Sequence, residues 1–203
     1  MAQRLITIDI AVFDGVDELD AVGPLEVLRR AARAGSPFEV RLVTAGKRLE
    51  VTGASGLRLR ADAPAGYPPR VLVMPGGGWV LRSDTGAWGE AQRGTWVDVV
   101  RATAKTGSLL AGVCTGTMIL AGAGIVGSRR AATHHAARAD LEASGATVLG
   151  DRVVDDGDLV TSGGVTSGID LALWLVERLA GRDLADQVAE DLEYLRFRPA
   201  PPR

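Results

Sequence analysis

The stretch SLLAGVCTG, Ser108–Gly116, runs from an apolar segment into a cysteine flanked by small residues. Residues 108–113 are typical of a strand buried on both faces of a parallel sheet. The residues after Gly116 are again apolar and fit a buried helix, so Cys114 falls on the sharp turn between strand and helix. The stretch therefore predicts an α/β fold that holds a cysteine on a strand-to-helix elbow.

Apolar runs of this kind recur along the chain and alternate with segments of helical spacing. The predicted strands are Leu5–Phe13, Phe38–Ala45, Val71–Met74, and a hairpin of Val153–Asp155 with Leu159–Thr161 that turns at Asp156-Gly157. The predicted helices are one opened by Gly23-Pro24, then Trp88–Lys105, Arg138–Ser144, Ser167–Ala180 and Leu184–Tyr194. Such alternation predicts a mostly parallel sheet covered on both faces, with ligands bound outside the carboxyl ends of its strands. We expect the functional loops after Phe13, Met74 and Val113.

Length and composition predict an ordinary globular protein. The chain has 203 residues, of which 46% are hydrophobic and 24% charged. This is enough to bury one large core and too little for two full enzyme domains. We expect a single domain over residues 1–198, followed by a Pro-rich tail at 199–203.

The charges and the cysteine count exclude several partners and locations. The 23 basic and 25 acidic residues are interspersed and give a net charge of −2, so no basic stripe is offered to nucleic acid. A single cysteine forms no intramolecular disulfide, and the first residues lack a basic signal region, so we expect a cytoplasmic protein. The uncharged stretch 106–128 is long enough to span a bilayer. Its six glycines favour a buried strand, turn and helix instead, and we expect no membrane partner.

Cys114 is the residue on which any chemistry depends. A lone cysteine in such a protein is most often a small buried hydrophobe. The Gly112-Val113-Cys114-Thr115-Gly116 elbow favours a nucleophile instead, because it places the sulfur at a helix amino terminus. We expect the partial positive charge there to hold the pKa of Cys114 below that of free cysteine.

Two backbone N–H groups are candidate donors for charge that develops on a substrate. One belongs to Thr115, which follows the nucleophile, and the other to Gly77 in the Gly76-Gly77-Gly78 loop after the strand 71–74. The loop alone is a weak signal, since a flexible turn has the same composition. It matches neither a dinucleotide fingerprint nor a P-loop.

Asp20 follows the first strand and can reach the same sheet edge as Cys114. The residues leave two roles open for it: a helix cap before Gly23-Pro24, or a carboxyl that hydrogen-bonds the sulfur and donates a proton. His134 and His135 are the only histidines, and one of them serves either as a base or as a hydrogen-bonding group of a loop. Adjacent histidines make a poor metal site, and we expect no metal.

Three further carboxylates, Asp155, Asp156 and Asp158, resemble calcium ligands only in composition. A solvated hairpin turn explains them better.

The ordered motifs together carry a family resemblance that covers nearly the whole chain. The chain resembles the ThiJ/PfpI superfamily of class I glutamine amidotransferase-like proteins, and within it the isonitrile hydratases. The matching pieces are Phe13-Asp14-Gly15, Leu19-Asp20, Gly23-Pro24, Met74-Pro75-Gly76-Gly77, Val113-Cys114-Thr115-Gly116, Ala131-Ala132-Thr133-His134, Thr161–Asp170 and Leu192-Glu193-Tyr194.

This resemblance implies a flavodoxin-like three-layer sandwich that forms homodimers. It implies Cys114 as nucleophile, Asp20 as the acid beside it, Gly77 and Thr115 as the oxyanion site, and His134 as an accessory residue. Peptidase-like branches carry His where this chain has Thr115, which argues against a Cys-His protease. Glyoxalase-like and chaperone-like branches carry Glu where this chain has Asp20, which favours the hydratase branch.

The activity so implied is hydration of an isonitrile to an N-substituted formamide through a Cys114 thioimidate, with no cofactor. Three alternatives stay open: a redox sensor, a glyoxalase-like enzyme, and a ligand-sensing domain related to regulators whose DNA-binding part this chain lacks. For the homodimer we expect an interface that includes Trp79, Val80, Leu81 and Trp88, which a monomer would expose beside the glycine-rich loop.

Overall fold

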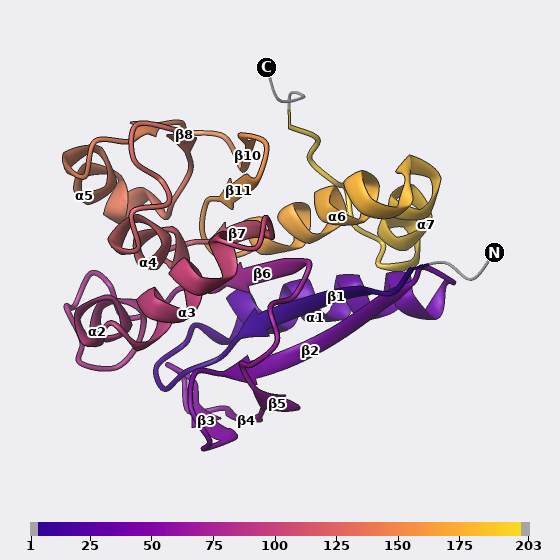
Figure 1. The fold of residues 1–203 in the computed structure, drawn as a ribbon. Coiled ribbons are helices and arrows are strands. Elements are labelled where there is room, and N and C mark those ends of the chain that lie inside the picture. Colours follow the sequence, from indigo (N-terminus) through magenta and orange to yellow (C-terminus); the bar gives the residue numbers. More distant parts are fainter. Residues whose placement is uncertain (1–3, 200–203) are drawn as a thin grey trace.

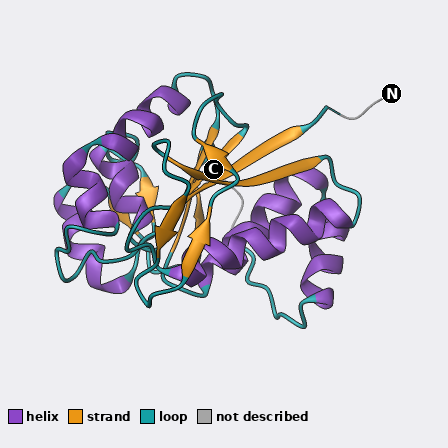
Figure 2. Cartoon of the chain, turned by 90° about the horizontal axis from the view of Figure 1, so that it is seen from below, coloured by secondary structure: helices purple, strands orange, loops and turns teal. Residues whose placement is uncertain are grey.

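A seven-stranded sheet lies between two layers of helices in the computed structural model, which describes residues 4–199 (Figures 1 and 2). Neighbouring strands are parallel except for β10, which is antiparallel to β11. This confirms the predicted α/β fold with a mostly parallel sheet. The strand order is β10 (Val153–Asp155), β11 (Leu159–Ser162), β7 (Leu109–Val113), β6 (Val71–Met74), β1 (Ile6–Ala11), β2 (Phe38–Thr44) and β5 (Ala63–Pro64).

Figure 2 shows a group of helices on each side of the strands. The helices that pack together in one layer are α1 (Glu18–Arg33), α6 (Ser167–Ala180) and α7 (Arg182–Asp191). Those of the other layer are α2 (Ala87–Arg93), α3 (Thr95–Ala104) and α4 (Gly116–Gly122). The smaller elements are β3 (Glu50–Thr52), β4 (Arg58–Arg60), β8 (Arg130–Ala131), a 3-10 turn (His135–Ala137), α5 (Arg138–Ala143) and β9 (Thr147–Val148).

β6 and β7 are parallel neighbours in the centre of the sheet, so their carboxyl ends lie side by side at one edge. Both are buried at every residue, because their sequences, VLVM and LLAGV, contain no polar side chain and helices cover both faces. β6 pairs with β1 on one side and β7 on the other, whereas the chain runs from β1 to β2 on the opposite side of β1. The edge at β1 and β6 is thus a topological switch point, where open α/β sheets bind ligands.

Helix α1 begins earlier than the sequence predicts. It starts at Glu18 because the side chain of Asp17 accepts a hydrogen bond from the N–H of Leu19 (3.2 Å) and caps the helix. Gly23-Pro24, predicted to open the helix, lies inside it. The reason is close packing: a Cβ on Gly23 would lie 3.3 Å from Ile169 of α6.

Residues 88–105, predicted as one helix, form two. Gly94 adopts φ 78°, a left-handed conformation, and separates α2 from α3. Trp96 and Val100 are buried in the core, while Val99 is half-buried.

The remaining predicted elements match the structure within a few residues at each end. The Pro-rich tail falls almost wholly outside the described residues, which end at Pro199. The stretch 106–128 forms β7 and α4 as expected, and within residues 4–199 no helix is long and apolar enough to cross a membrane.

Candidate active site

Cys114 lies on the predicted elbow between β7 and α4, in a strained backbone conformation. Its φ is 55°, a left-handed value that non-glycine residues rarely adopt and that costs on the order of 1–3 kcal/mol. The turn is tight because Gly116 follows: a Cβ there would lie 1.9 Å from the carbonyl oxygen of Met74. The N–H of Cys114 donates to the carbonyl of Ser162 (3.2 Å), which joins the elbow to β11.

A pocket of about 190 Å³ opens over the sulfur. Four of the five predicted site residues line this pocket, namely Cys114, Thr115, Gly77 and His134. The other lining residues are Asp17, Gly78, Trp79, Val80, Leu81 and Val165. We call this cavity the cysteine pocket.

Asp20, the fifth predicted residue, is fully buried in the first turn of α1, beside the Cys114 thiol. Its Oδ2 accepts a hydrogen bond from the N–H of Gly76 (3.0 Å), and its buried Oδ1 has no hydrogen-bond partner among residues 4–199. The cap interpretation of Asp20 is wrong, because Asp17 is the cap. Burial, followed by the nearby charge of Asp17, raises the pKa of Asp20 to about 8, so the carboxyl is mostly protonated at neutral pH.

The expectation of a lowered pKa for Cys114 is wrong. Burial of Cys114, which is 5% exposed, raises the pKa of its thiol, and the Asp20 carboxyl next to it raises that pKa further. The N–H of Thr115 lowers the pKa of the thiol, but this effect is smaller than those of burial and of Asp20. The helix α4 spans only seven residues, so its amino terminus offers the sulfur little compensation.

The glycine-rich loop after β6 is tied to the elbow. The N–H of Gly77 donates to Oγ1 of Thr115 (2.9 Å). The close approach requires Gly76, where a Cβ would lie 2.4 Å from Thr115 Oγ1 and 3.0 Å from Asp20 Oδ2. The N–H of Gly77 is therefore already used in a hydrogen bond to the Thr115 hydroxyl. The hydroxyl's own hydrogen is available to a further acceptor.

His134 borders the cysteine pocket as a neutral side chain. Burial, and then the neighbouring His135, lower the pKa of His134. Its Nδ1 accepts a hydrogen bond from the N–H of Ala136 (3.3 Å), so the neutral ring carries its proton on Nε2. The ring lies close to the elbow across Gly164, where a Cβ would meet His134 Cδ2 at 2.2 Å and Cys114 Sγ at 3.2 Å. In this tautomer His134 is a hydrogen-bond donor at Nε2 and not a base.

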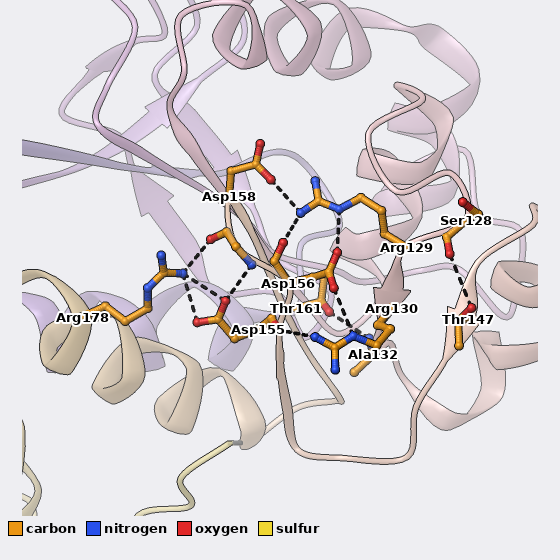
Figure 3. A network of polar contacts seen from close by, with 11 residues as sticks. Ser128, Arg129, Arg130, Ala132, Thr147, Asp155, Asp156, Asp158, Thr161 and Arg178 are labelled. Carbon is orange, nitrogen blue, oxygen red and sulfur yellow. Dashed lines mark hydrogen bonds and ion pairs between the residues drawn. The ribbon is translucent and has the colours of Figure 1, made fainter. Parts of the chain in front are cut away.

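The three carboxylates of the β10–β11 hairpin face arginines, as Figure 3 shows. Asp155 binds Arg178 (3.0 Å), Asp156 binds Arg129 (2.8 Å) and Arg130 (3.1 Å), and Asp158 binds Arg129 (2.6 Å). They form a structural network that holds the hairpin. Across the described part of the chain no group of three His, Cys, Asp or Glu side chains is placed to hold a metal ion.

Two residues of the site were missed by the sequence analysis. Asp17 could have been found, because Asp directly before Glu18 is an ordinary helix cap. Gly164 belongs to a matching block of the family resemblance, but only the structure places it between the sulfur and the histidine ring.

The apolar cluster beside the glycine-rich loop is only partly exposed, contrary to expectation. Trp79 is buried, and its indole Nε1 donates to Asp140 (2.7 Å). Trp88 is half-buried and meets Trp79 edge-on, with ring centroids 4.9 Å apart. Val80 and Leu81 remain exposed, at 62% and 86%.

Comparison with known proteins agrees with this architecture. The profile of the DJ-1/PfpI family matches residues 7–178. The isonitrile hydratase of Pseudomonas putida is 37% identical over 202 residues, which cover 97% of this chain and 81% of that protein. A ThiJ/PfpI family protein from Pseudomonas syringae superposes with a TM-score of 0.82 at 26% identity, covering 98% of this chain and 78% of that one. Drosophila melanogaster DJ-1beta has the same fold, with a TM-score of 0.82 at 23% identity over 95% of this chain and all of that one. The chain therefore belongs to the DJ-1/PfpI family.

Proposed function

We propose that this protein hydrates an isonitrile to an N-substituted formamide, with Cys114 as nucleophile and Asp20 as proton donor. The observation that carries the proposal is the buried contact between the two, in which Asp20 has a pKa of about 8 and keeps its proton at neutral pH. The similarity to the Pseudomonas putida isonitrile hydratase supports the choice of substrate.

The first step adds the S–H bond of Cys114 across the terminal carbon of the isonitrile. Asp20 donates its proton to that carbon, which makes the carbon electrophilic, and the sulfur attacks it. The thiol proton passes to the Asp20 carboxylate. The products are a thioimidate, R–N=CH–S–Cys114, and a reprotonated Asp20. A thiol of raised pKa fits this scheme, because no free thiolate has to be stable before substrate enters.

The second step adds water to the thioimidate carbon. Asp20 donates its proton to the nitrogen and takes one from the attacking water, which leaves a tetrahedral R–NH–CH(OH)–S–Cys114. The C–S bond then breaks, the hydroxyl proton returns to the sulfur, and the formamide R–NH–CHO leaves. The net reaction is R–NC plus water to R–NH–CHO.

Thr115 supplies the donors for charge on the reacting atoms. Its N–H faces the sulfur, and its hydroxyl, which accepts from Gly77, keeps its own hydrogen for donation to substrate. Gly77 thus acts through Thr115 rather than directly. His134, protonated on Nε2, is an accessory donor at the wall of the pocket.

The redox-sensing alternative has less support. Oxidation by peroxides selects exposed thiols of low pKa, whereas Cys114 is buried and the pKa of its thiol is raised.

Rapid mixing with cyclohexyl isocyanide tests the covalent route. After an acid quench, mass spectrometry of the Cys114 peptide is expected to detect an adduct with the mass of one isocyanide that rises and decays before formamide reaches its plateau. Cys114→Ser serves as the control. Formamide production at full rate from Cys114→Ser would contradict the proposal.

A further inference from the structure

A second pocket adjoins the cysteine pocket and shares two of its walls. It has a volume of about 270 Å³, and His134 and Val165 line both cavities. Arg138, Asp151 and Arg152 contribute its charged side chains. His134 and Val165 therefore form the boundary between the two cavities.

The guanidinium of Arg152 already has hydrogen-bond partners within the protein. Its Nε donates to Asp170 (2.7 Å), and its Nη2 donates to Thr166 (3.1 Å) and Tyr194 (3.2 Å). Because Asp170 is fully buried, this pair is a fixed part of the wall and leaves no net charge for a ligand.

Arg138 is not satisfied. Its Nε is buried without an acceptor in the described part of the chain, and within residues 4–199 its guanidinium forms neither an ion pair nor a hydrogen bond. Gly150 opposite it has no side chain, and even a Cβ there would stay 3.8 Å from both terminal nitrogens of Arg138. Arg138 thus lines the second pocket without a partner for its guanidinium among the described residues, and its buried Nε–H is a donor whose lack of an acceptor is unfavourable.

The position of Arg138 is fixed relative to the cysteine pocket. It is the first residue of α5, and Asp140, two residues later, accepts the indole hydrogen bond of Trp79 from the wall of that pocket. Arg138 is also close enough to His134 for its charge to act on that ring.

We propose that Arg138 binds a carboxylate at the far end of the substrate, so that the preferred substrates are isonitriles that carry a carboxylate a few carbons from the reactive group. This inference rests on the proposed function. A guanidinium fork matches a carboxylate in geometry. A monoanion fits better than a dianion, because the pocket offers one unpaired cation and the exposed Asp151, which also lines it, repels added negative charge.

The test compares 3-isocyanopropanoate with its methyl ester, which lacks the negative charge and is longer by one methyl group. The wild type is expected to prefer the acid by about tenfold in kcat/KM. Arg138→Gln should bring this ratio near one through a higher KM for the acid, with the ester changed by less than about twofold. Arg138→Lys, which keeps the positive charge, should retain part of the preference for the acid. This variant provides the comparison with wild type if Arg138→Gln folds poorly. Arg58→Gln in β4, which lines neither pocket, is the matched control and should leave the ratio unchanged. Equal ratios in wild type and Arg138→Gln would overturn the inference while leaving the hydratase intact.

A binding measurement separates this inference from the proposed function. Cys114→Ala should bind N-formyl-β-alanine, the acid product, about tenfold more tightly than its methyl ester by calorimetry, and Arg138→Gln in the same background should remove the difference. If the protein turns over no isonitrile, the proposed function is wrong. The binding preference for the acid still tests whether Arg138 binds a carboxylate. Equal affinity for both compounds, or a preference that survives Arg138→Gln, would refute it.

Discussion

The backbone N–H of Gly77 donates to the Thr115 hydroxyl at 2.9 Å, so the loop after β6 and the elbow after β7 hold each other in place. Both residues line the cysteine pocket. Because the hydroxyl oxygen is the acceptor in this bond, its own hydrogen is not used in it. Gly77 and Thr115, the two residues predicted for the oxyanion site, are therefore joined by a hydrogen bond that uses the Gly77 N–H.

Thr115→Val removes the hydroxyl while keeping the shape of the side chain. The variant should lose about 10²-fold in kcat, since one donor to the reacting atoms is lost. Its free energy of unfolding should fall by about 1 kcal/mol because the Gly77 N–H loses its acceptor. Thr115→Ser keeps the hydroxyl and should stay within about tenfold of wild type. Equal kcat in the Val and Ser variants, measured by formamide production, would show that the hydroxyl takes no part.

Asp20→Asn keeps an oxygen that can accept from the Gly76 N–H but has no carboxyl proton to donate. We expect kcat to fall by about 10² to 10⁴ with little loss of stability at neutral pH. Wild-type activity in this variant would leave Asp20 a structural role only.

The pH dependence gives a second readout of Asp20. The reaction needs its protonated form, so kcat should decline as the pH rises through about 8.

The free energy of unfolding should also decrease as the pH rises toward 8. The pKa of Asp20 is about 8 in the folded state against an ordinary value of 3.8, so between these pH values the folded state binds more protons than the unfolded state. The contribution of Asp20 to stability is full below about pH 4 and is lost toward pH 8, by up to about 1.4 kcal/mol per pH unit. Urea unfolding at pH 5 and 7.5 should show this slope in wild type and not in Asp20→Asn.

Most of the fold could be predicted from the sequence because its strands are short apolar runs between glycine-rich turns. Val71–Met74 and Ser167–Ala180 match the structure residue for residue. The start of α1 could not be predicted, because Gly23-Pro24 normally opens a helix and the packing of Gly23 on Ile169 became visible only in three dimensions.

The sequence was enough to predict which residues form the site, but not the pKa values of their side chains. The position of Cys114 follows from the strand-turn-helix pattern. The raised pKa values of Cys114 and Asp20 follow from burial and mutual contact, which spacing along the chain does not reveal. The hydrogen bond from Gly77 to Thr115 likewise depends on how two distant loops approach.

Gly164 separates the sulfur from the His134 ring and has no room for a side chain. In Gly164→Ala the new methyl group would meet His134 Cδ2 at 2.2 Å, so the ring must move and kcat/KM should fall by about tenfold or more. The neighbouring Gly163→Ala is the matched control, because its Cβ would make only ordinary contacts, the nearest at 3.4 Å to Ser167 Oγ. Equal kcat/KM in the two variants would argue against a close fit around the sulfur.

The exposed Val80 and Leu81 at the mouth of the cysteine pocket predict a homodimer whose partner covers them. Light scattering at micromolar concentration should give a mass near twice the 21.2 kDa of one chain. Leu81→Asp should weaken the dimer, whereas Leu195→Asp, at a leucine of similar exposure, should not. A fully active protein with the mass of one chain would contradict the prediction. Loss of the dimer in Leu81→Asp without change in turnover would place the whole pocket within one chain.

Turnover of isonitriles by Cys114 can be measured by following formamide production from cyclohexyl isocyanide alongside loss of methylglyoxal. We expect steady formamide production by the wild type and little consumption of methylglyoxal. Cys114→Ala should show less than a few percent of the wild-type rate and an unchanged fold by circular dichroism. Substantial formamide production by Cys114→Ala would contradict the nucleophile, and consumption of methylglyoxal without formamide production would contradict the reaction.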